Sequence, residues 1–172
     1  SMLAGKTEKI DFKALSDLLS LGMVPVLTPI AVNRRGRIFR INSDSLASEV
    51  AEGLRATKLI YLTSSASILV DNPNPKAFPV EELRGLIENS PELLKPELLS
   101  KCRNALKALD STDTRRAHIL DGDEFACLLT ELFEKVGCGT MIYADEYQKI
   151  RRATPDDASA IYHLSMVSAR TQ

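Results

Sequence analysis

The chain has 172 residues, of which 44% are hydrophobic and 26% charged, a balance typical of one globular domain or of one domain with part of a second. Lysine and arginine number 22 against 23 aspartates and glutamates, so the net charge is -1. This near balance argues against a nucleic-acid-binding domain and against a polybasic membrane-surface protein, and no apolar run reaches the ~20 residues of a membrane-spanning helix.

Apolar periodicity predicts helices and strands in alternation, joined by short connections. In chain order, we expect a helix over residues 12–21, strands over 24–30 and 38–41, a helix over 45–54, a strand over 58–63, helices over 80–89 and from residue 96 onward, a strand over 117–120, a helix over 124–133, and a loop that leads into a strand over 137–142. Such alternation is typical of an α/β three-layer sandwich with a mainly parallel sheet.

Local residues mark helix ends and buried strands. Asp11 is expected to cap the first helix, and Gly22 to end it. Either Ser43 or Asp44 is expected to cap the helix over 45–54. The apolar run over 24–30 is too short for a helix interior and contains two prolines, so we interpret it as a buried strand.

The end of the chain differs from the rest. Residues 149–153 read as a strand, and Thr154 and Pro155 begin a helix as N-cap and first helical residue. One strand and one helix cannot bury their own apolar faces. We therefore expect this segment to be the opening of a second domain that has been cut away.

Few side chains carry a recognisable chemistry. Cys102, Cys127 and Cys138 are odd in number and widely spaced, which indicates a reducing compartment and argues against a disulfide framework and a cysteine zinc site. His118 lies in a predicted strand and is interpreted as a structural residue. No nucleotide-binding or zinc motif is present, so no metal site is expected.

Two constellations stand out. Residues 41–45 join a strand end to a helix start, where backbone N–H groups could face an anion, although N-capping alone explains the pattern. Residues 131–140 end a helix in carboxylates and continue into a glycine-bracketed loop. Carboxylates and helix C-terminal carbonyls attract a cation such as a guanidinium, and an ordinary glycine C-cap is the alternative.

Taken in order, these segments resemble the C-terminal part of an amino-acid-kinase-like domain of the acetylglutamate branch, followed by the start of a GNAT acetyltransferase domain. The segments that carry the resemblance are residues 22–30, 41–44, 58–63, 118–122, 131–133, 137–142 and 150–157. This layout is that of N-acetylglutamate synthases, which use acetyl-CoA and glutamate in the first step of arginine biosynthesis. The resemblance implies a kinase-like regulatory domain over 8–146 and a truncated GNAT domain over 147–172.

The resemblance also implies a domain that has lost phosphotransfer. Family kinases carry an aspartate after the residue that matches Thr63, where this chain has Ser64-Ser65, and their glycine-rich lysine stretch has no match between residues 91 and 107. A vestigial kinase-like site is implied at Asn42, Asp44, Thr63 and Ser64. No catalytic residue is expected in this chain. L-arginine is the implied effector, and the residues implied to bind it are Glu131, Gly137, Gly139 and Thr140.

Three interpretations follow. The first is a synthase fragment that holds the arginine-sensing lobe, the second an acetylglutamate kinase fragment, and the third a non-enzymatic arginine-binding module. No cofactor is expected in the chain itself, since acetyl-CoA is a substrate of the whole enzyme. The full-length synthase is expected to be a homo-oligomer, in the cytoplasm of a bacterium or in the plastid or mitochondrial matrix of a eukaryote.

Overall fold

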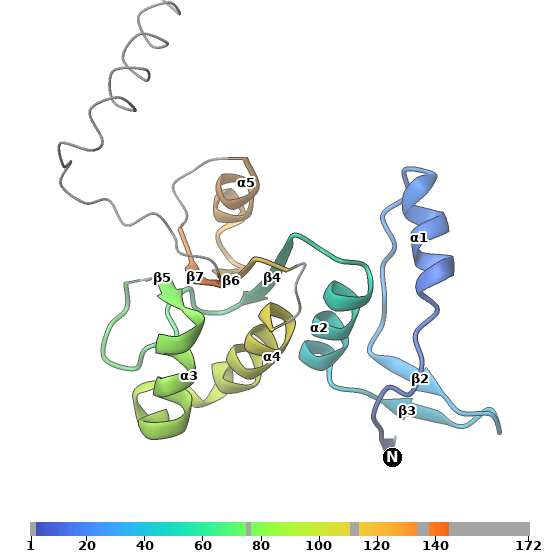
Figure 1. Cartoon of the computed structure of the whole chain (residues 1–172), viewed down its shortest axis with the longest axis horizontal. Helices are drawn as coiled ribbons and strands as arrows, with labels where there is room; N and C mark the ends of the chain where they lie inside the picture. Colours follow the sequence, from blue (N-terminus) through green and yellow to red (C-terminus); the bar gives the residue numbers. More distant parts are fainter. Residues whose placement is uncertain (1–2, 75–76, 111–113, 134–137, 145–172) are drawn as a thin grey trace, which may run out of the picture.

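A four-stranded sheet organises the computed structural model, which describes residues 3–74, 77–110, 114–133 and 138–144 (Figure 1). Its strands are β4 (Lys58–Thr63), β5 (Ala77–Pro79), β6 (Arg116–Asp121) and β7 (Thr140–Tyr143), in the order β4-β6-β7-β5. β4 pairs with β6 and β5 with β7 in parallel, whereas β6 and β7 are antiparallel. This mixed, mostly parallel sheet confirms the expected α/β class.

Helices cover both faces of the sheet, so the molecule has the three expected layers (Figure 1). The helices on one side are α2 (Ser43–Gly53), α3 (Val80–Asn89) and α4 (Leu99–Leu109), which follows two short 3-10 turns, Pro91–Leu93 and Pro96–Leu98. On the other side lies α5 (Phe125–Phe133), which contacts β6.

The core lies between the sheet and α4. This helix buries Cys102, Ala105, Leu106 and Leu109 at intervals of three or four residues, which places them on one stripe. Side chains alternate between the faces of a strand. Leu59 and Ile119 therefore point into this core, while the paired Ile60 and His118 face α5.

A smaller unit precedes the sheet. Its elements are β1 (Leu3–Ala4), α1 (Phe12–Ser20), β2 (Ile30–Val32) and β3 (Ile38–Arg40), with the strand order β1-β3-β2. Asp11 caps α1, because its Oδ1 accepts a hydrogen bond from the Ala14 N–H at 3.0 Å. Gly22 follows the end of α1 with φ +75°, a conformation that glycine adopts without strain. Both roles are as predicted.

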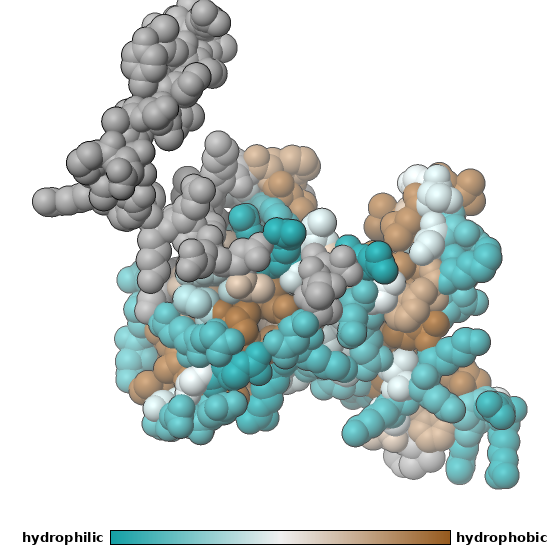
Figure 2. Space-filling model, viewed as in Figure 1, coloured by the Kyte–Doolittle hydropathy of each residue, from teal (hydrophilic) through white to brown (hydrophobic). Residues whose placement is uncertain are grey.

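The buried strand predicted over 24–30 is wrong. A strand begins only at Ile30, and the side chains of Val24 and Val26 are 86% and 89% exposed. Pro25 and Pro29 have no N–H to donate to a strand ladder, and within this segment only Ile30 lies in a strand that pairs with a described neighbour, β3. Apolar side chains along α1 and this segment consequently reach the surface (Figure 2).

The cap of α2 is also corrected. Oδ1 of Asn42 accepts a hydrogen bond from the Ser45 N–H at 2.9 Å, so the helix begins at Ser43, one residue after its cap. The strand and helix expected over 149–166 lie outside the described residues. Within the described ranges, no helix has both the length and the apolar character needed to cross a membrane.

Candidate functional site

The first candidate site lies at the start of α2. Asp44 is buried, with 8% of its surface exposed, and its Oδ1 lies 3.3 Å from Nζ of Lys101 on α4. The Tyr61 hydroxyl donates to the Asp44 carbonyl at 2.9 Å and so ties β4 to the same helix turn. Burial, together with the Asp44 charge, raises the pKa of Tyr61 above its usual range, so the hydroxyl stays protonated.

Only part of the predicted kinase-like set comes together here. Asn42 is exposed and uses its side chain as the helix cap. Thr63 ends β4, and its carbonyl accepts from the Gly122 N–H at 2.7 Å. No hydrogen bond or ion pair in the described part of the chain joins Asp44 to Thr63 or Ser64.

Lys101 is the residue of this site that sequence reasoning missed. Its side chain is 22% exposed, and it lies next to the fully buried Cys102. A lysine at the edge of an otherwise apolar helix stripe was the available signal, because such a side chain usually pairs with a buried acid or extends past the core.

The segment after β4 is fastened to the turns before α4. The Lys95 N–H donates to the Ile68 carbonyl at 2.9 Å, and the Val70 N–H donates to the Leu93 carbonyl at 3.0 Å. The Lys95 ammonium donates to Oγ of Ser65 at 2.6 Å. Leu94, which is 1% exposed, is buried next to these hydrogen bonds. These contacts close the region beside the carboxyl end of β4.

The second candidate site lies between α5 and β6. Oε1 of Glu131 lies 2.7 Å from Nδ1 of His118, and both side chains are at least 92% buried. The two atoms touch without good hydrogen-bond geometry, and Oε2 of Glu131 and Nε2 of His118 have no hydrogen-bond partner among the described residues. The Lys58 ammonium donates to the Glu131 carbonyl at 3.1 Å.

The environment of His118 holds it neutral. Burial is the largest cause that lowers its pKa, to about 4, and the charges of Lys58 and Arg116 act in the same direction. The carboxyl group of Glu131 therefore lies beside an uncharged imidazole. A buried carboxylate with one unpartnered oxygen is well suited to a donor that brings a positive charge.

The other predicted arginine-site residues have structural tasks in the described fold. Thr140 is 1% exposed, and both its N–H and its Oγ1 donate to the Ala66 carbonyl, at 3.1 and 2.6 Å. A Cβ added to Gly139 would lie 2.5 Å from the Ile119 carbonyl oxygen, so this position needs glycine for a close approach of two backbones. Gly137 lies outside the described residues.

A disulfide joins Cys127 of α5 to Cys138 before β7. The cysteines were not expected to pair, because their number and spacing show no framework, and this interpretation is wrong for two of them. Cys102 is the buried free cysteine. Burial raises its pKa to about 12, which keeps the thiol protonated.

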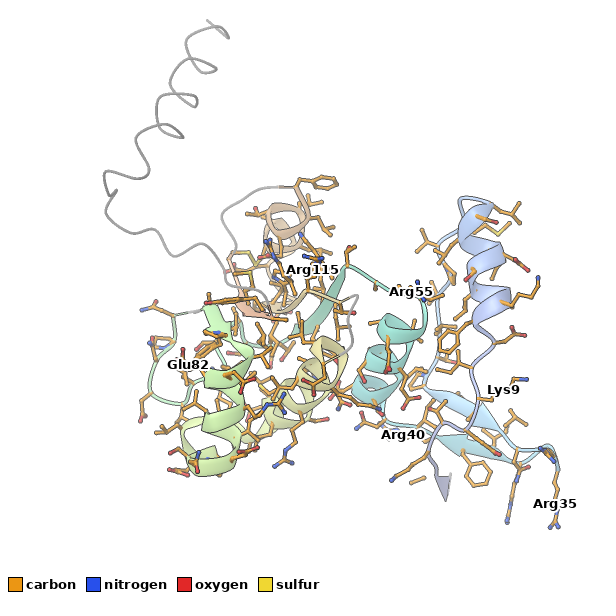
Figure 3. All side chains as sticks on the ribbon, in the orientation of Figure 1. Lys9, Arg35, Arg40, Arg55, Glu82 and Arg115 are labelled. Carbon is orange, nitrogen blue, oxygen red and sulfur yellow. A yellow bond between two sulfur atoms is a disulfide. The ribbon has the colours of Figure 1, made fainter. Side chains whose placement is uncertain are left out.

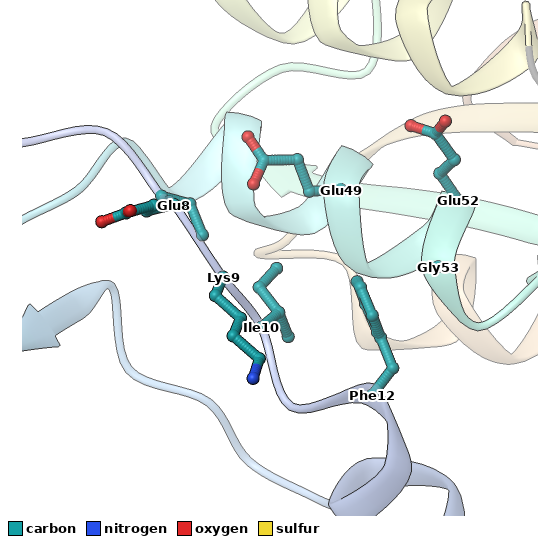
Figure 4. Close-up of a pocket in the computed structure, with 8 residues that line it drawn as sticks. Glu8, Lys9, Ile10, Phe12, Glu49, Glu52 and Gly53 are labelled. Atoms are coloured by element: carbon teal, nitrogen blue, oxygen red, sulfur yellow. The ribbon is translucent and has the colours of Figure 1, made fainter.

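A shallow pocket of about 280 Å³ lies between residues 7–12 and α2 (Figure 4). Its lining residues are Thr7, Glu8, Lys9, Ile10, Phe12, Glu49, Glu52 and Gly53. The pocket lies in a different part of the molecule from the second candidate site. Lys9, one of its lining residues, lies in the N-terminal unit, away from α5 and from the labelled Arg115 (Figure 3). None of the sequence-predicted site residues lines this pocket. The described residues hold no group of three histidine, cysteine or acidic side chains placed to bind a metal ion.

The profile of the amino acid kinase family matches residues 2–121. The chain belongs to the amino acid kinase family. Acetylglutamate kinase of Archaeoglobus fulgidus is 36% identical over 141 residues, which are 80% of this chain and 48% of that protein. The acetylglutamate kinase of Methanocaldococcus jannaschii is 32% identical over 145 residues, 82% of this chain and 47% of that protein. The chain thus spans about half the length of these curated relatives.

Solved structures extend the relationship to the synthases. N-acetylglutamate synthase from Neisseria gonorrhoeae complexed with coenzyme A and N-acetyl-glutamate matches with 31% identity and a TM-score of 0.74, over 94% of this chain and 37% of that one. The same enzyme complexed with coenzyme A and L-arginine matches with 26% identity and a TM-score of 0.76, over 95% and 43%. Carbamate kinase from Giardia lamblia bound to citric acid matches with 18% identity and a TM-score of 0.64, over 81% of this chain and 45% of that one. At this identity the match shows the shared fold alone.

Proposed function

We propose that this member of the amino acid kinase family is part of an N-acetylglutamate synthase, and that the whole protein transfers the acetyl group of acetyl-CoA to the amino group of glutamate. In this proposal residues 8–146 are the C-terminal part of a regulatory domain that senses arginine and has lost phosphotransfer. Residues 147–172 begin the GNAT acetyltransferase domain. The whole protein assembles as a homo-oligomer.

The observation that carries the loss of phosphotransfer is the closed region beside β4. Ser65, in the segment where family kinases carry an acid, is bound by the Lys95 ammonium at 2.6 Å. The N–H groups of Lys95 and Val70 already donate to carbonyls, so they are not available to phosphate oxygens. Phosphate sites need several free N–H groups that point to one place. The buried Leu94 further opposes a charged nucleotide here.

The extent of the matches also favours a synthase. The synthase structures cover 94% and 95% of this chain, while the acetylglutamate kinases named above cover 80% and 82%. The structural matches to the synthases thus extend over more of this chain than the sequence matches to these two kinases do, which supports the proposal.

Arginine sensing rests on Glu131. Its Oε2 is buried without a hydrogen-bond partner in the described part of the chain, and His118 beside it is neutral. A guanidinium would satisfy that oxygen and balance the charge, and a charge-assisted hydrogen bond of this kind contributes about 1.5–3 kcal/mol. A related synthase has been crystallised with L-arginine. In this proposal Gly137, Gly139 and Thr140 complete the site.

Acetylglutamate kinase is the second candidate function, and the Asp44–Lys101 pair favours it. A buried carboxylate held 3.3 Å from an ammonium is an arrangement that can position groups for phosphoryl transfer. Titration of the protein with ATP and magnesium separates the two candidates. A synthase regulatory domain should show no heat of binding in the micromolar range and no ADP release with N-acetylglutamate. ATP binding that disappears in Asp44→Asn would instead establish the kinase.

Arginine sensing is tested in the full-length protein by the effect of arginine on acetyl transfer. Glu131→Gln should shift the arginine concentration for half of its effect upward by about one to two decades, because one charged contact is lost. Glu124→Gln is the matched control, since Glu124 is an exposed acid just before α5. An unchanged response in Glu131→Gln would leave this residue as a structural partner of His118 only.

A further inference from the structure

The attachment of α5 to the sheet depends on few side chains. Among the α5 side chains that the structure describes, only Cys127 and Glu131 are buried. They are four residues apart and so lie on one face of the helix. The larger apolar residues Leu129, Leu132 and Phe133 are 45%, 46% and 82% exposed. Among the described side chains of α5, apolar packing therefore contributes little to holding the helix against the sheet.

Two links hold this face in place. Glu131 touches His118 and receives the Lys58 ammonium at its carbonyl. Cys127 forms the disulfide with Cys138. The first link is polar, and the second is covalent. The disulfide is therefore the strongest connection between α5 and the rest of the described fold.

The other end of the disulfide is firmly anchored. Gly139, directly after Cys138, packs against the backbone of Ile119 on β6. Thr140 binds the Ala66 carbonyl through two donors. The disulfide thus fastens a weakly packed helix to a strand end that is fixed by the central sheet.

We infer that the Cys127–Cys138 disulfide is a reversible redox site whose state decides how firmly α5, and with it Glu131, is held against β6. Its co-reactant is a dithiol reductant. Disulfides in cytosolic proteins are usually transient and catalytic or redox-sensing, and this step rests on the cytoplasmic location expected for a bacterial synthase. The consequence for arginine rests on the proposed function, because Glu131 lies one helical turn after Cys127, and Gly139 and Thr140 directly follow Cys138.

The exchange proceeds from the more accessible sulfur. Cys138 is half-buried, whereas Cys127 is 4% exposed, so an incoming thiolate reaches Sγ of Cys138 first. That attack forms a mixed disulfide and breaks the S–S bond, and Cys127 leaves as a thiolate that takes up a proton. The second thiol of the reductant then attacks the mixed disulfide and releases Cys138 as a thiol. Two electrons pass to the protein, and the dithiol becomes a disulfide.

Hydrogen exchange measures the state of α5 directly. The protein is oxidised with oxidised glutathione, and one half is then reduced with dithiothreitol. We expect amides of α5 to exchange at least about tenfold faster after reduction, while amides of β4 stay unchanged as the internal reference. Mass spectrometry after unfolding and alkylation should find one alkylated cysteine, Cys102, in the oxidised protein and three in the reduced protein.

Variants identify the bond that is responsible. The double variant Cys127→Ala/Cys138→Ala should exchange at the fast rate with or without reductant. Cys102→Ala, which removes the free cysteine of α4, should keep the full redox response. Labelling of Cys127 and Cys138 after oxidation, or equal α5 exchange in both redox states, would overturn the redox site.

Arginine titration by calorimetry of the two redox states tests the link to the proposed function. A dissociation constant about tenfold higher after reduction supports it, because Glu131 is then less often in place. Equal dissociation constants, together with a redox-dependent α5, would overturn the link and leave the redox site. Absence of arginine binding in both states, measured in the full-length protein, would overturn the arginine proposal while the exchange experiment still decides the redox site.

Discussion

Acidification from pH 7 to pH 5 should weaken the fold through His118. This histidine is 1% exposed, and its pKa in the folded protein is about 4, against 6.5 in an unfolded chain. Above pH 6.5 the imidazole is neutral in both states. Below that value the unfolded chain gains a proton that the folded protein does not accept until the pH approaches 4. The free energy of unfolding therefore falls as the pH falls through this window.

The size of the effect follows from the two pKa values. If His118 were fully protonated in the unfolded chain and fully neutral in the folded protein, the difference between the two pKa values would lower the free energy of unfolding by about 3 kcal/mol. Between pH 7 and pH 5 only part of that difference is reached, and the linkage relation gives a loss of about 2 kcal/mol. Most carboxylates titrate below this range. The loss between pH 7 and pH 5 is therefore assigned to histidine.

Urea unfolding at pH 7, 6 and 5 measures this loss. His118→Gln should remove most of the pH dependence, and His163→Gln, which alters the second histidine, should retain it. A wild-type protein that becomes more stable on acidification would refute the reasoning. That result would mean that the Glu131 carboxylate at 2.7 Å outweighs burial and makes His118 cationic in the folded state.

Local sequence signals predicted much of the main body. The strand over 58–63 and the helix over 80–89 match β4 and α3 residue for residue, and the predicted helix over 124–133 differs from α5 by one residue. Such elements are specified by their own periodicity and caps. Burial is different, because it depends on neighbours. Residues 24–30 carry a strand-like apolar pattern, yet in the described fold only Ile30 of this segment pairs within a strand, and two prolines limit the pairing of the others.

The candidate sites could be predicted only in part, because their contacts join distant segments. Asp44 stood out at a helix start, but its partner Lys101 comes from another helix, 57 positions later in the chain. Glu131 stood out as a carboxylate near a glycine loop, whereas its contact with His118 requires α5 to lie across β6. The Cys127–Cys138 disulfide was missed because pairing depends on a Cα–Cα distance, here 5.7 Å, that spacing alone does not give.

Two further predictions concern packing and charge. Gly139→Ala should lower the free energy of unfolding by about 1–3 kcal/mol, because its Cβ would press on the Ile119 carbonyl. Gly85→Ala lies in α3, where no atom is within 4 Å of the new Cβ, so it should instead raise the free energy of unfolding by up to about 1 kcal/mol. If thermal unfolding showed that both substitutions stabilise or that both destabilise the protein, this account would be contradicted.

Charge pairing is tested at Lys101, whose loss leaves the Asp44 carboxylate, 12% exposed, without its ammonium partner. Lys101→Met should therefore cost about 3 kcal/mol. Adding Asp44→Asn should recover most of that loss, since no buried charge then remains unpaired. The exposed pair Lys13–Asp17 is closer, at 2.6 Å, but its side chains are 84% and 62% exposed, so Lys13→Met should cost at most about 0.5 kcal/mol. Equal losses at the two lysines in urea unfolding would mean that distance, rather than burial, sets the strength of these pairs.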